Sequence, residues 1–384
     1  MVLSARARID KQTELAYSRY TIDKNLEGKA AVIYSSLDCG YRSPNNICSL
    51  HGACSQIPDS SGTYCGDCTS RTSKLQTFLN KPKIPGLPAQ LLQPTFRNRI
   101  QGLVTDPNIF NCSILVYEGK TLLAYRKSWS KAEVWLAELD SSFNAISNVK
   151  LDIPRTKFNQ IGSEDPRLFV HNGKLFVSYT GYSSYPRKSL AHMMYSLITP
   201  EGKVISTFLP YLSVRNEWEK NWAYFSHANT LFAVHSLNPY TVLEVQDEYA
   251  WIHFISDPVF PVSLQDIGSA RGGSSPYLYQ TPNGQYEWYC FTHNLFMIEN
   301  DFWYGMSCYT FENKPPFKPV RYLPGHMLLA TPKDRPGLST PHVIFPCGAY
   351  VQDGKWTISY GYYDVYCEVA QFDVKELDSK MVSV

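Results

Sequence analysis

The sequence lacks a strong excess of charge of either sign. Lys and Arg total 36 and Asp and Glu total 34, which gives a formal net charge of +2 at pH 7. Proteins that bind nucleic acid normally gather Lys and Arg on one surface to neutralise phosphates. We therefore expect no nucleic-acid partner.

Long apolar runs are also missing. No run approaches the ~18 residues of a membrane-spanning helix, so we expect no membrane span. The first residues, MVLSARARIDKQ, lack the apolar core of a secretory signal, which indicates an intracellular protein or a trimmed sequence. We find no long amphipathic helical pattern either, so the secondary structure is expected to be mainly strands.

Cysteine is plentiful and unevenly distributed. Half of the ten cysteines lie close together, at Cys39, Cys48, Cys54, Cys65 and Cys68. The stretch CSLHGACSQIPDSSGTYCGDC resembles part of an epidermal-growth-factor-like module, without its full six-cysteine pattern. Disulfides are the leading interpretation and favour a secretory or extracellular location. Zinc held by the last four of these cysteines, or free thiols, are the alternatives.

Four segments differ in character along the chain. They are a mixed N-terminal segment (1–37), the Cys-rich insert (38–70), a linker rich in proline (71–93) and a region of repeats (94–384). Five stretches of the last region share one pattern, in which an apolar run, a short turn and an aromatic-rich strand follow one another. They cover residues 112–127, 166–182, 222–240, 275–294 and 341–364. The turns EGK, HNGK, PNGQ and QDGK are typical of hairpins, whereas HANT in the third stretch is a weaker signal.

Repeated hairpins of this kind indicate a particular all-β fold. A single hairpin cannot bury both of its faces, and radial stacking of such units is a common solution. We predict a five-bladed β-propeller of four-stranded blades over residues 94–384, with a small N-terminal Cys-rich module. A β-sandwich is the structural alternative. Aromatic residues make up 14% of the chain, and their flat rings suit both strands and sugars.

The segment GSEDPRLF carries the clearest chemical signal. An acid at this strand entrance can protonate a leaving oxygen if burial raises its pKa. Neighbouring residues of an extended strand point to opposite faces, so only one of the two acids can address the central channel directly. We expect Asp165 rather than Glu164 to be the acid, and Glu164 to bind the sugar or hold Arg167. Arg167 can hold a carboxylate through two hydrogen bonds. A structural Asp–Arg pair in a turn is the alternative.

Phosphate is a second candidate ligand. Glycoside hydrolysis normally needs two carboxylates, but a phosphorylase uses phosphate as a nucleophile that is already charged. Lys220 in EKNWAYF, His293 in FTHN and Tyr304 in FWYG can hold such an anion. A solvated lysine and a structural histidine are the alternatives for these positions.

Taken together, these segments resemble glycoside hydrolase family 130, which comprises β-mannoside phosphorylases and some hydrolases and is related to β-1,2-mannosyltransferases. NIFNCSILVYEGKTLLAYR is similar to the opening motif of the family, and IGSEDPRLF to its G-x-EDPR signature. KNW, RGGSSPYL, WYCFTHN and HVIFPCGAYVQDGKWTISYGYYD are similar to the later motifs. The matches keep the family's order along the chain.

The resemblance implies roles for individual residues. Asp165 corresponds to the general acid, whose proton passes through a hydroxyl of the bound mannose. Lys220, His293 and Tyr304 fall where phosphorylases bind phosphate. The residues expected to bind the substrate are Asn111, Arg126, Glu164, Arg167, Asn221, Arg271 and Asp364.

The sequence departs from the family pattern at several positions. Cys112 replaces a proline, Arg271 stands where many phosphorylases have a small residue, and Arg215 is only a candidate for a further phosphate-binding arginine. Cys347, inside the closing motif, is expected to be a buried free thiol. Phosphorolysis, transfer and hydrolysis therefore stay open.

The leading functional hypothesis is an inverting enzyme that makes or breaks β-mannosidic bonds. It would act on an oligosaccharide or glycan with inorganic phosphate or a sugar phosphate as co-substrate, and with no metal or other cofactor. A β-mannoside or related hydrolase is the first alternative, and a five-bladed arabinofuranosidase is a weaker one. A non-catalytic glycan-binding propeller is the alternative from a different class.

Overall fold

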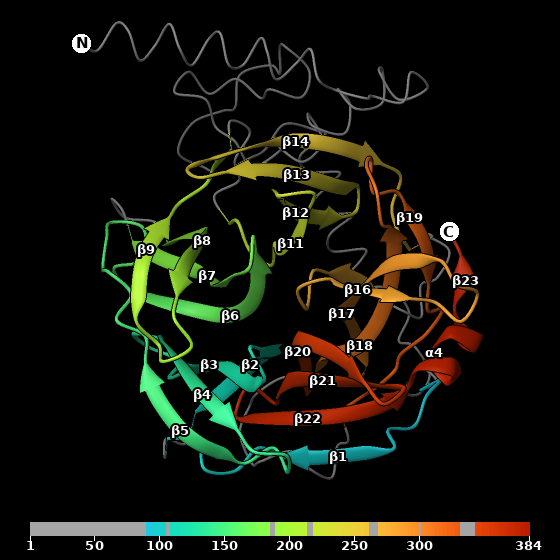
Figure 1. Cartoon of the computed structure of the whole chain (residues 1–384), viewed down its shortest axis with the longest axis horizontal. Helices are drawn as coiled ribbons and strands as arrows, with labels where there is room; N and C mark the ends of the chain where they lie inside the picture. Colours follow the sequence, from blue (N-terminus) through green and yellow to red (C-terminus); the bar gives the residue numbers. More distant parts are fainter. Residues whose placement is uncertain are drawn as a thin grey trace, which may run out of the picture.

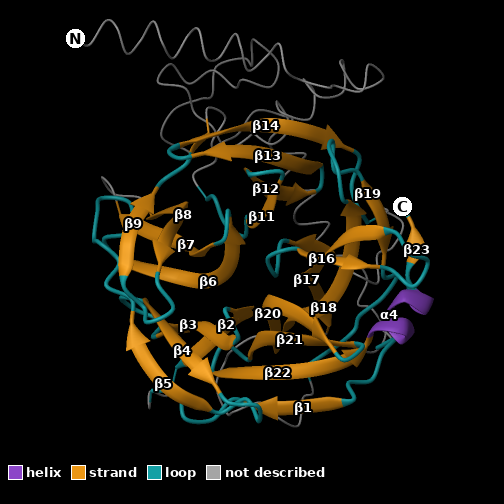
Figure 2. Ribbon diagram, in the orientation of Figure 1, coloured by secondary structure: helices purple, strands orange, loops and turns teal. Residues whose placement is uncertain are grey.

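The computed structural model of this chain describes residues 90–104, 108–184, 189–212, 218–260, 268–298, 301–330 and 342–384. The predicted segments 1–37 and 38–70, most of the linker 71–93, and Arg215 lie outside the described residues. The predictions for the Cys-rich module, with its disulfides or zinc, therefore stay predictions. Strands dominate the described part, where α4 (Val374–Lys380) is the one helix (Figure 2), so the predicted all-β class is confirmed.

Two four-stranded antiparallel sheets begin the repeat region. The first contains β2 (Ile109–Tyr117), β3 (Lys120–Lys127), β4 (Glu133–Leu139) and β5 (Ala145–Lys150). The second contains β6 (Gly162–His171), β7 (Lys174–Ser184), β8 (Ser189–Ile198) and β9 (Val204–Phe208). Consecutive strands pair throughout both sheets, as expected for hairpins joined in series.

The third sheet has one strand more than predicted. It contains β11 (Ala223–His227), β12 (Thr230–Leu237), β13 (Tyr240–Gln246) and β14 (Tyr249–Ser256), with the short β10 (Tyr211–Leu212) added parallel to β14. β10 is added outside β14, so β11 to β14 keep the order predicted for a four-stranded blade.

The remaining strands form a single ten-stranded sheet instead of two separate blades. Its first half contains β15 (Ser269–Arg271), β16 (Tyr277–Gln280), β17 (Tyr286–Ile298), β18 (Asp301–Glu312), β19 (Pro319–Tyr322) and β23 (Val382–Ser383). Its second half contains β20 (His342–Gln352), β21 (Lys355–Tyr362), β22 (Tyr366–Asp373) and β1 (Phe96–Arg99). The halves are joined where Trp303 and Tyr304 pair in parallel with His342 and Val343, a link that hairpin patterns do not encode.

The sheets surround a common centre (Figure 1). Strands β2, β6, β11, β16 and β20 lie nearest to this centre, and β5, β9, β14 and β1 lie at the periphery. β1 pairs with β22, which precedes the C-terminus, so the two ends of the described chain meet in one sheet. This pairing fixes the first sheet against the last.

Positive φ angles confirm most of the predicted hairpin turns. Both central residues are left-handed in the turns at Glu118–Gly119, Asn172–Gly173, Ala228–Asn229 and Asp353–Gly354. Such type I′ turns match the twist of the paired strands. HANT therefore forms the same turn as the stronger signals, whereas PNGQ belongs to a longer loop in which only Gly284 is left-handed.

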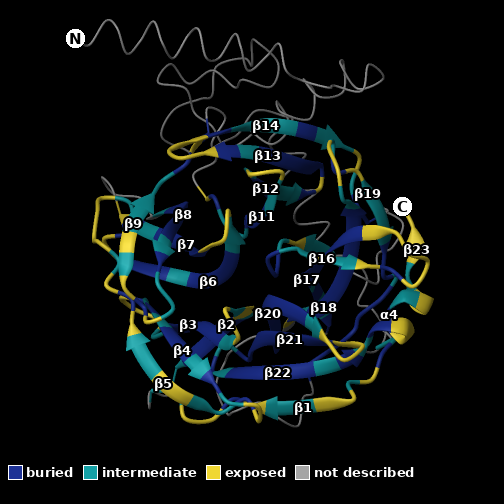
Figure 3. Ribbon diagram, in the orientation of Figure 1, coloured by how far each residue is buried: buried dark blue, intermediate teal, exposed yellow. Residues whose placement is uncertain are grey.

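The strands consist mainly of buried residues, whereas exposed residues are concentrated in the loops and outer strands (Figure 3). Leu122 and Val134 of the first sheet pack in one buried cluster with Leu168 and Val177 of the second. The fully buried Trp356 ring lies 4.9 Å from that of Tyr289, across the two halves of the ten-stranded sheet. Burial of this kind stabilises a ring of sheets by roughly 25 cal/mol for each Å² of apolar surface removed from water.

The five cysteines outside the N-terminal cluster are buried free thiols. They are Cys112, Cys290, Cys308, Cys347 and Cys367. The prediction for Cys347 is thereby confirmed. Among the described residues, no helix has the length and apolar character needed to cross a membrane.

Candidate functional site

Four predicted site residues have left-handed backbones. Asn111, Asp165, Asn221 and Asp364 have φ angles of 52°, 53°, 62° and 53°. Asn and Asp adopt this region more readily than other non-glycine residues. Strained conformations of this kind are concentrated at functional sites, so their recurrence supports a shared site.

Strand bulges account for two of these conformations. The pairing of β2 with β3 shifts between Phe110 and Ser113, and the pairing of β6 with β7 shifts between Glu164 and Arg167. A bulge places an extra residue on one strand and turns its side chain away from the regular alternation. Asn111 and Asp165 thus hold equivalent positions on neighbouring inner strands.

Asp165 lies in a network of direct contacts with residues of the first sheet. Asn111 Nδ2 donates a hydrogen bond to Asp165 Oδ1 at 2.8 Å, and Arg126 donates to the same oxygen at 3.2 Å. The Arg126 guanidinium also donates to Glu164 Oε1 at 2.7 Å. Lys220 Nζ lies 3.7 Å from the other oxygen of Glu164. Both acids therefore reach the same arginine.

That shared arginine corrects one expectation. Alternation along an extended strand assigned only one of the two adjacent acids to the site. The left-handed backbone of Asp165 breaks the alternation, so Glu164 and Asp165 turn toward the same cations. Glu164, which was expected to bind the sugar or hold Arg167, contacts Arg126 beside Asp165.

Arg167 has a different role from the one expected. It is fully buried and donates to the backbone oxygens of Gly273 and Asp165 and, at 2.9 Å, to Asn221 Oδ1. None of these acceptors is a carboxylate, so within the described residues Arg167 does not make the expected two-pronged contact with a carboxylate. Arg167 instead links the backbone of β6 at Asp165 to the segments that contain Asn221 and Gly273.

The charges around Asp165 lower its pKa. Burial acts to raise the pKa of this carboxyl, but the positive charges of Arg126 and Lys220, with the Asn111 hydrogen bond, outweigh it. Asp165 is therefore ionised at neutral pH. From the sequence we expected burial to raise the pKa of the catalytic acid, whereas the pKa of Asp165 is lowered.

Two neighbouring acids have the opposite shift. Burial, with the charge of Asp165, raises the pKa of Glu164 to about 7 against the attraction of Arg126 and Lys220. Burial and the same Asp165 charge raise the pKa of Asp364 to about 7. The site thus combines one ionised carboxylate with two carboxyls that exchange protons near neutral pH.

Asp364 reaches the site from a tight turn. Val365 N donates to Tyr362 O at 3.1 Å, and Tyr363 and Asp364 are both left-handed, as in a type I′ turn between β21 and β22. Asp364 holds the second central position of this turn, where Asp tolerates the left-handed backbone. This accounts for the aspartate at the end of the Tyr-Gly-Tyr-Tyr-Asp stretch.

The three predicted phosphate ligands form two groups. Lys220 lies beside Glu164, and its Nζ is 4.4 Å from the centre of the Tyr182 ring. The ring centre of His293 lies 4.2 Å from that of Phe345 and 5.8 Å from that of Tyr304, so these two candidates are neighbours. Arg167 bridges the groups, because its guanidinium lies 5.6 Å from the Phe345 ring.

His293 is neutral at physiological pH. Its ring is buried, and burial followed by the charges of Arg271 and Arg167 lowers its pKa well below the usual value. Nδ1 has no hydrogen-bond partner within the described part of the chain. Arg271 pairs with His293 across β15 and β17, and its side chain is exposed. A neutral His293 can hold an anion through an N–H group, but not through charge.

Several aromatic neighbours of these residues were not predicted. Tyr182 and Trp218 flank Lys220, Trp129 flanks Arg126, and Phe345 separates His293 from Arg167. Their proximity in sequence to Arg126 and Lys220 was the available signal for the two tryptophans. Aromatic residues are so common in these strands that the signal was not distinctive.

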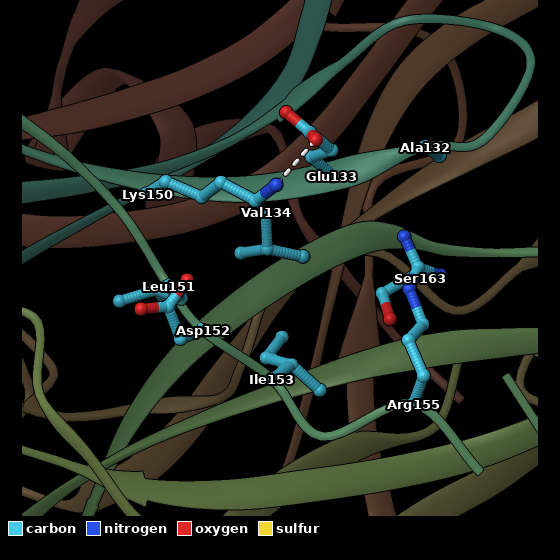
Figure 4. A pocket seen from close by; sticks show the side chains of 9 residues that line it. All are labelled: Ala132, Glu133, Val134, Lys150, Leu151, Asp152, Ile153, Arg155 and Ser163. Atoms are coloured by element: carbon cyan, nitrogen blue, oxygen red, sulfur yellow. Dashed lines mark hydrogen bonds and ion pairs between the residues drawn. The ribbon is translucent and has the colours of Figure 1, made fainter. Parts of the chain in front are cut away.

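A cavity of about 200 Å³ lies apart from this network (Figure 4). Its lining comes mainly from β4, β5 and the following connection, and includes Glu133, Lys150 and Arg155. Glu133 is paired with Lys150 there. None of the predicted site residues lines it, so the charged network is the stronger candidate.

Comparison with known proteins identifies shared structure without close sequence similarity. No family model matches the chain, and no curated protein matches its sequence. β-1,2-Mannobiose phosphorylase from Listeria innocua is 14% identical, with a TM-score of 0.55, covering 77% of this chain and 96% of that one. A glycosyl hydrolase from Bacteroides ovatus is 12% identical, with a TM-score of 0.51, covering 70% and 85%.

A third structure comes from work on glycoside hydrolase family 130 itself. It was described for hydrolases of that family that target β-1,2-mannosidic linkages in Candida mannan, and is 13% identical, with a TM-score of 0.53, covering 70% of this chain and 85% of that one. At such identities the likeness is one of fold. The resemblance to family 130 that the motifs indicated is thereby confirmed at the level of the fold.

Proposed function

We propose that residues 94–384 form a five-bladed β-propeller enzyme that makes or breaks β-mannosidic bonds with inversion. The blade assignment divides the ten-stranded sheet at the short β18–β20 link, and β1 then completes the last blade. Two of the structural neighbours, the Listeria innocua phosphorylase and the family 130 structure, are described for β-1,2-mannosides, which supports this substrate class.

The observation that carries the proposal is the group of three carboxyls. Asp165 is held as a carboxylate by Arg126 and Asn111, while Glu164 and Asp364 have pKa values of about 7. Sites of acid–base catalysis typically hold nearby acids in different environments, so that their pKa values differ. A binding protein needs no such arrangement.

The proposed roles follow from these charges. Because Asp165 is ionised, it first takes up a proton from Glu164 or Asp364, whose pKa values are about 7. It then donates this proton through a hydroxyl of the bound sugar to the leaving oxygen. Arg126 and Asn111 fix the Asp165 carboxylate. Asp364 and Glu164 bind sugar hydroxyls and hold exchangeable protons close to it.

Phosphate or a phosphorylated sugar donor is the proposed co-substrate. Lys220 is charged, since the negative charges of Asp165 and Glu164 raise its pKa against the effect of burial. His293 and Tyr304 supply hydrogen bonds. We place no metal or other cofactor in the reaction.

Hydrolysis is the second candidate, and Asp364 is the observation that favours it. A hydrolase needs a carboxylate base that activates water on the opposite face of the sugar. Asp364, with its pKa near 7, belongs to the second half of the ten-stranded sheet, whereas Asp165 belongs to the second sheet. It is therefore the residue to test as that base.

A product analysis separates these reactions. The full chain is incubated with β-1,2-manno-oligosaccharides with and without phosphate, and with mannose-1-phosphate or GDP-mannose plus an acceptor. Phosphorolysis gives mannose-1-phosphate from the oligosaccharides only when phosphate is present, and in reverse gives longer glycans and phosphate from mannose-1-phosphate. Transfer from a nucleotide sugar gives longer glycans from GDP-mannose, and hydrolysis gives mannose in either buffer. Absence of product with every combination would contradict the proposed function.

A further inference from the structure

Two exposed tryptophans lie beside the charged network. The chain has eight tryptophans, and all of them fall within the described residues. Trp129 and Trp218 retain 46% and 50% exposure, whereas the other six are buried or of intermediate exposure. An isolated exposed aromatic side chain needs no explanation. Both of these, however, adjoin a cation of the candidate site.

Trp218 belongs to the Lys220 side of the network. Its ring meets that of Tyr182 edge-on at 5.7 Å, and Lys220 Nζ lies 5.8 Å from its ring centre. The same ammonium lies 3.7 Å from Glu164 Oε2. The tryptophan is thus linked to the acid through one lysine.

Trp129 has the matching position on the Arg126 side. Its ring lies 4.9 Å from the buried Phe110 ring, and the Arg126 guanidinium lies 5.7 Å from its ring centre. The guanidinium also donates to Trp129 O at 3.3 Å and to Glu164 Oε1 at 2.7 Å. Each oxygen of Glu164 therefore leads, through a cation, to an exposed tryptophan.

These contacts orient both indoles while leaving much of their surface in water. A cation within about 6 Å of an aromatic ring contributes roughly 0.5–1 kcal/mol at an exposed site. The inner aromatic neighbours, Tyr182 and Phe110, further restrict each ring. The result is a fixed apolar surface next to groups that bind hydroxyls, a combination that matches the C–H face and hydroxyl edge of a sugar ring.

We propose that Trp129 and Trp218 are stacking platforms for sugar rings beyond the one that contacts Asp165. The site would then select a chain of two or more sugars over a monosaccharide. This inference rests on the proposed function, because it assumes that a mannoside occupies the network around Asp165.

Calorimetric titration of the full chain tests the inference. The probes are mannose, β-1,2-mannobiose and β-1,2-mannotriose. We expect the wild type to bind the longer probes more tightly than mannose. Trp218→Ala and Trp129→Ala should each weaken mannotriose binding by about tenfold, the scale of a lost aromatic stacking contact. Mannose binding should be nearly unchanged.

Two controls make the result specific. Tyr249→Ala removes an exposed aromatic side chain from the outer strand β14 and should leave all three affinities unchanged. Trp218→Phe and Trp129→Phe keep a flat ring and should restore most of the mannotriose affinity. Unfolding midpoints of every variant identify any loss that comes from misfolding.

The outcomes separate the two proposals. If the wild type binds mannosides but both alanine variants retain its dependence on chain length, the platforms are refuted and the proposed function stands. If the wild type binds none of the probes, the proposed function fails and the platforms fail with it.

Discussion

Replacement of Asp364 by Asn should make the folded protein more stable at alkaline pH. The carboxyl is held where burial and the charge of Asp165 disfavour its ionisation, and its pKa is raised from 3.8 to about 7. Asn keeps the size of the side chain and tolerates the left-handed backbone at φ 53°. The substitution therefore removes an unfavourable charge without disturbing the turn.

The sign of the effect follows from proton linkage. Unfolded Asp364 loses its proton near pH 4 and folded Asp364 near pH 7, so its contribution to stability is greatest below pH 4. That contribution is lost as pH rises to about 7 and then stays constant. A shift of about three pKa units corresponds to about 4 kcal/mol. Between pH 5 and pH 9, the stability of Asp364→Asn relative to wild type should rise by about 3 kcal/mol.

Urea unfolding followed by tryptophan fluorescence at several pH values measures this difference. Asp353→Asn is the matched control, because Asp353 also has a left-handed backbone in a type I′ turn but is exposed and remote from the acids. It reports any effect of an Asp-to-Asn change in a turn of this type. A relative stability of Asp364→Asn that stays flat or falls between pH 5 and pH 9 would refute the reasoning.

Two further substitutions test the network around Asp165. Gly361→Ala should lower activity by at least about tenfold in protein that an unfolding midpoint shows to be folded, because the added Cβ would overlap the Asn111 amide that holds Asp165. Gly354→Ala is the control: its Cβ meets no neighbouring atom, so it adds only the backbone strain of an alanine at positive φ, in a turn of β20 and β21. Equal activity of both variants would count against the contact. Lys220→Met should abolish any use of phosphate and move the alkaline limb of the pH profile of kcat/KM to higher pH, because the lysine charge lowers the pKa values of Glu164 and Asp364, which hold the exchangeable protons. Lys355→Met, at an exposed turn, should change neither, and an unshifted profile in Lys220→Met would exclude Lys220 from the site.

The sequence was informative wherever local chemistry determines the structure. Asn172–Gly173 and Asp353–Gly354 predicted hairpins because these residues accept positive φ, and the turns formed there. The pairing of β1 with β22 joins segments about 270 residues apart, and no local pattern indicates it. The parallel link of Tyr304 to Val343 was likewise unpredictable, since it depends on how two sheets meet.

The sequence indicated which polar side chains lie together, but not the electrostatics of the group that they form. Motif order gave Asn111, Arg126 and Asp165, which the structure brings into direct contact. The low pKa of Asp165 and the raised pKa of Asp364 depend on charges contributed by separate strands. The effect of all these charges on one carboxyl depends on the folded structure, so the spacing of residues along one strand does not predict it.

Turnover of β-1,2-mannobiose by wild type, Asp165→Asn and Glu164→Gln, with and without phosphate, tests the central claim most directly. Asp165→Asn keeps the side-chain shape but cannot exchange an acidic proton, so its kcat should fall by at least ~100-fold while sugar binding and the unfolding midpoint are largely retained. Glu164→Gln should lose less, because Glu164 is assigned to binding. An active Asp165→Asn protein would remove Asp165 from the mechanism, and a wild type that binds mannobiose but turns it over under neither condition would contradict phosphorolysis and hydrolysis alike.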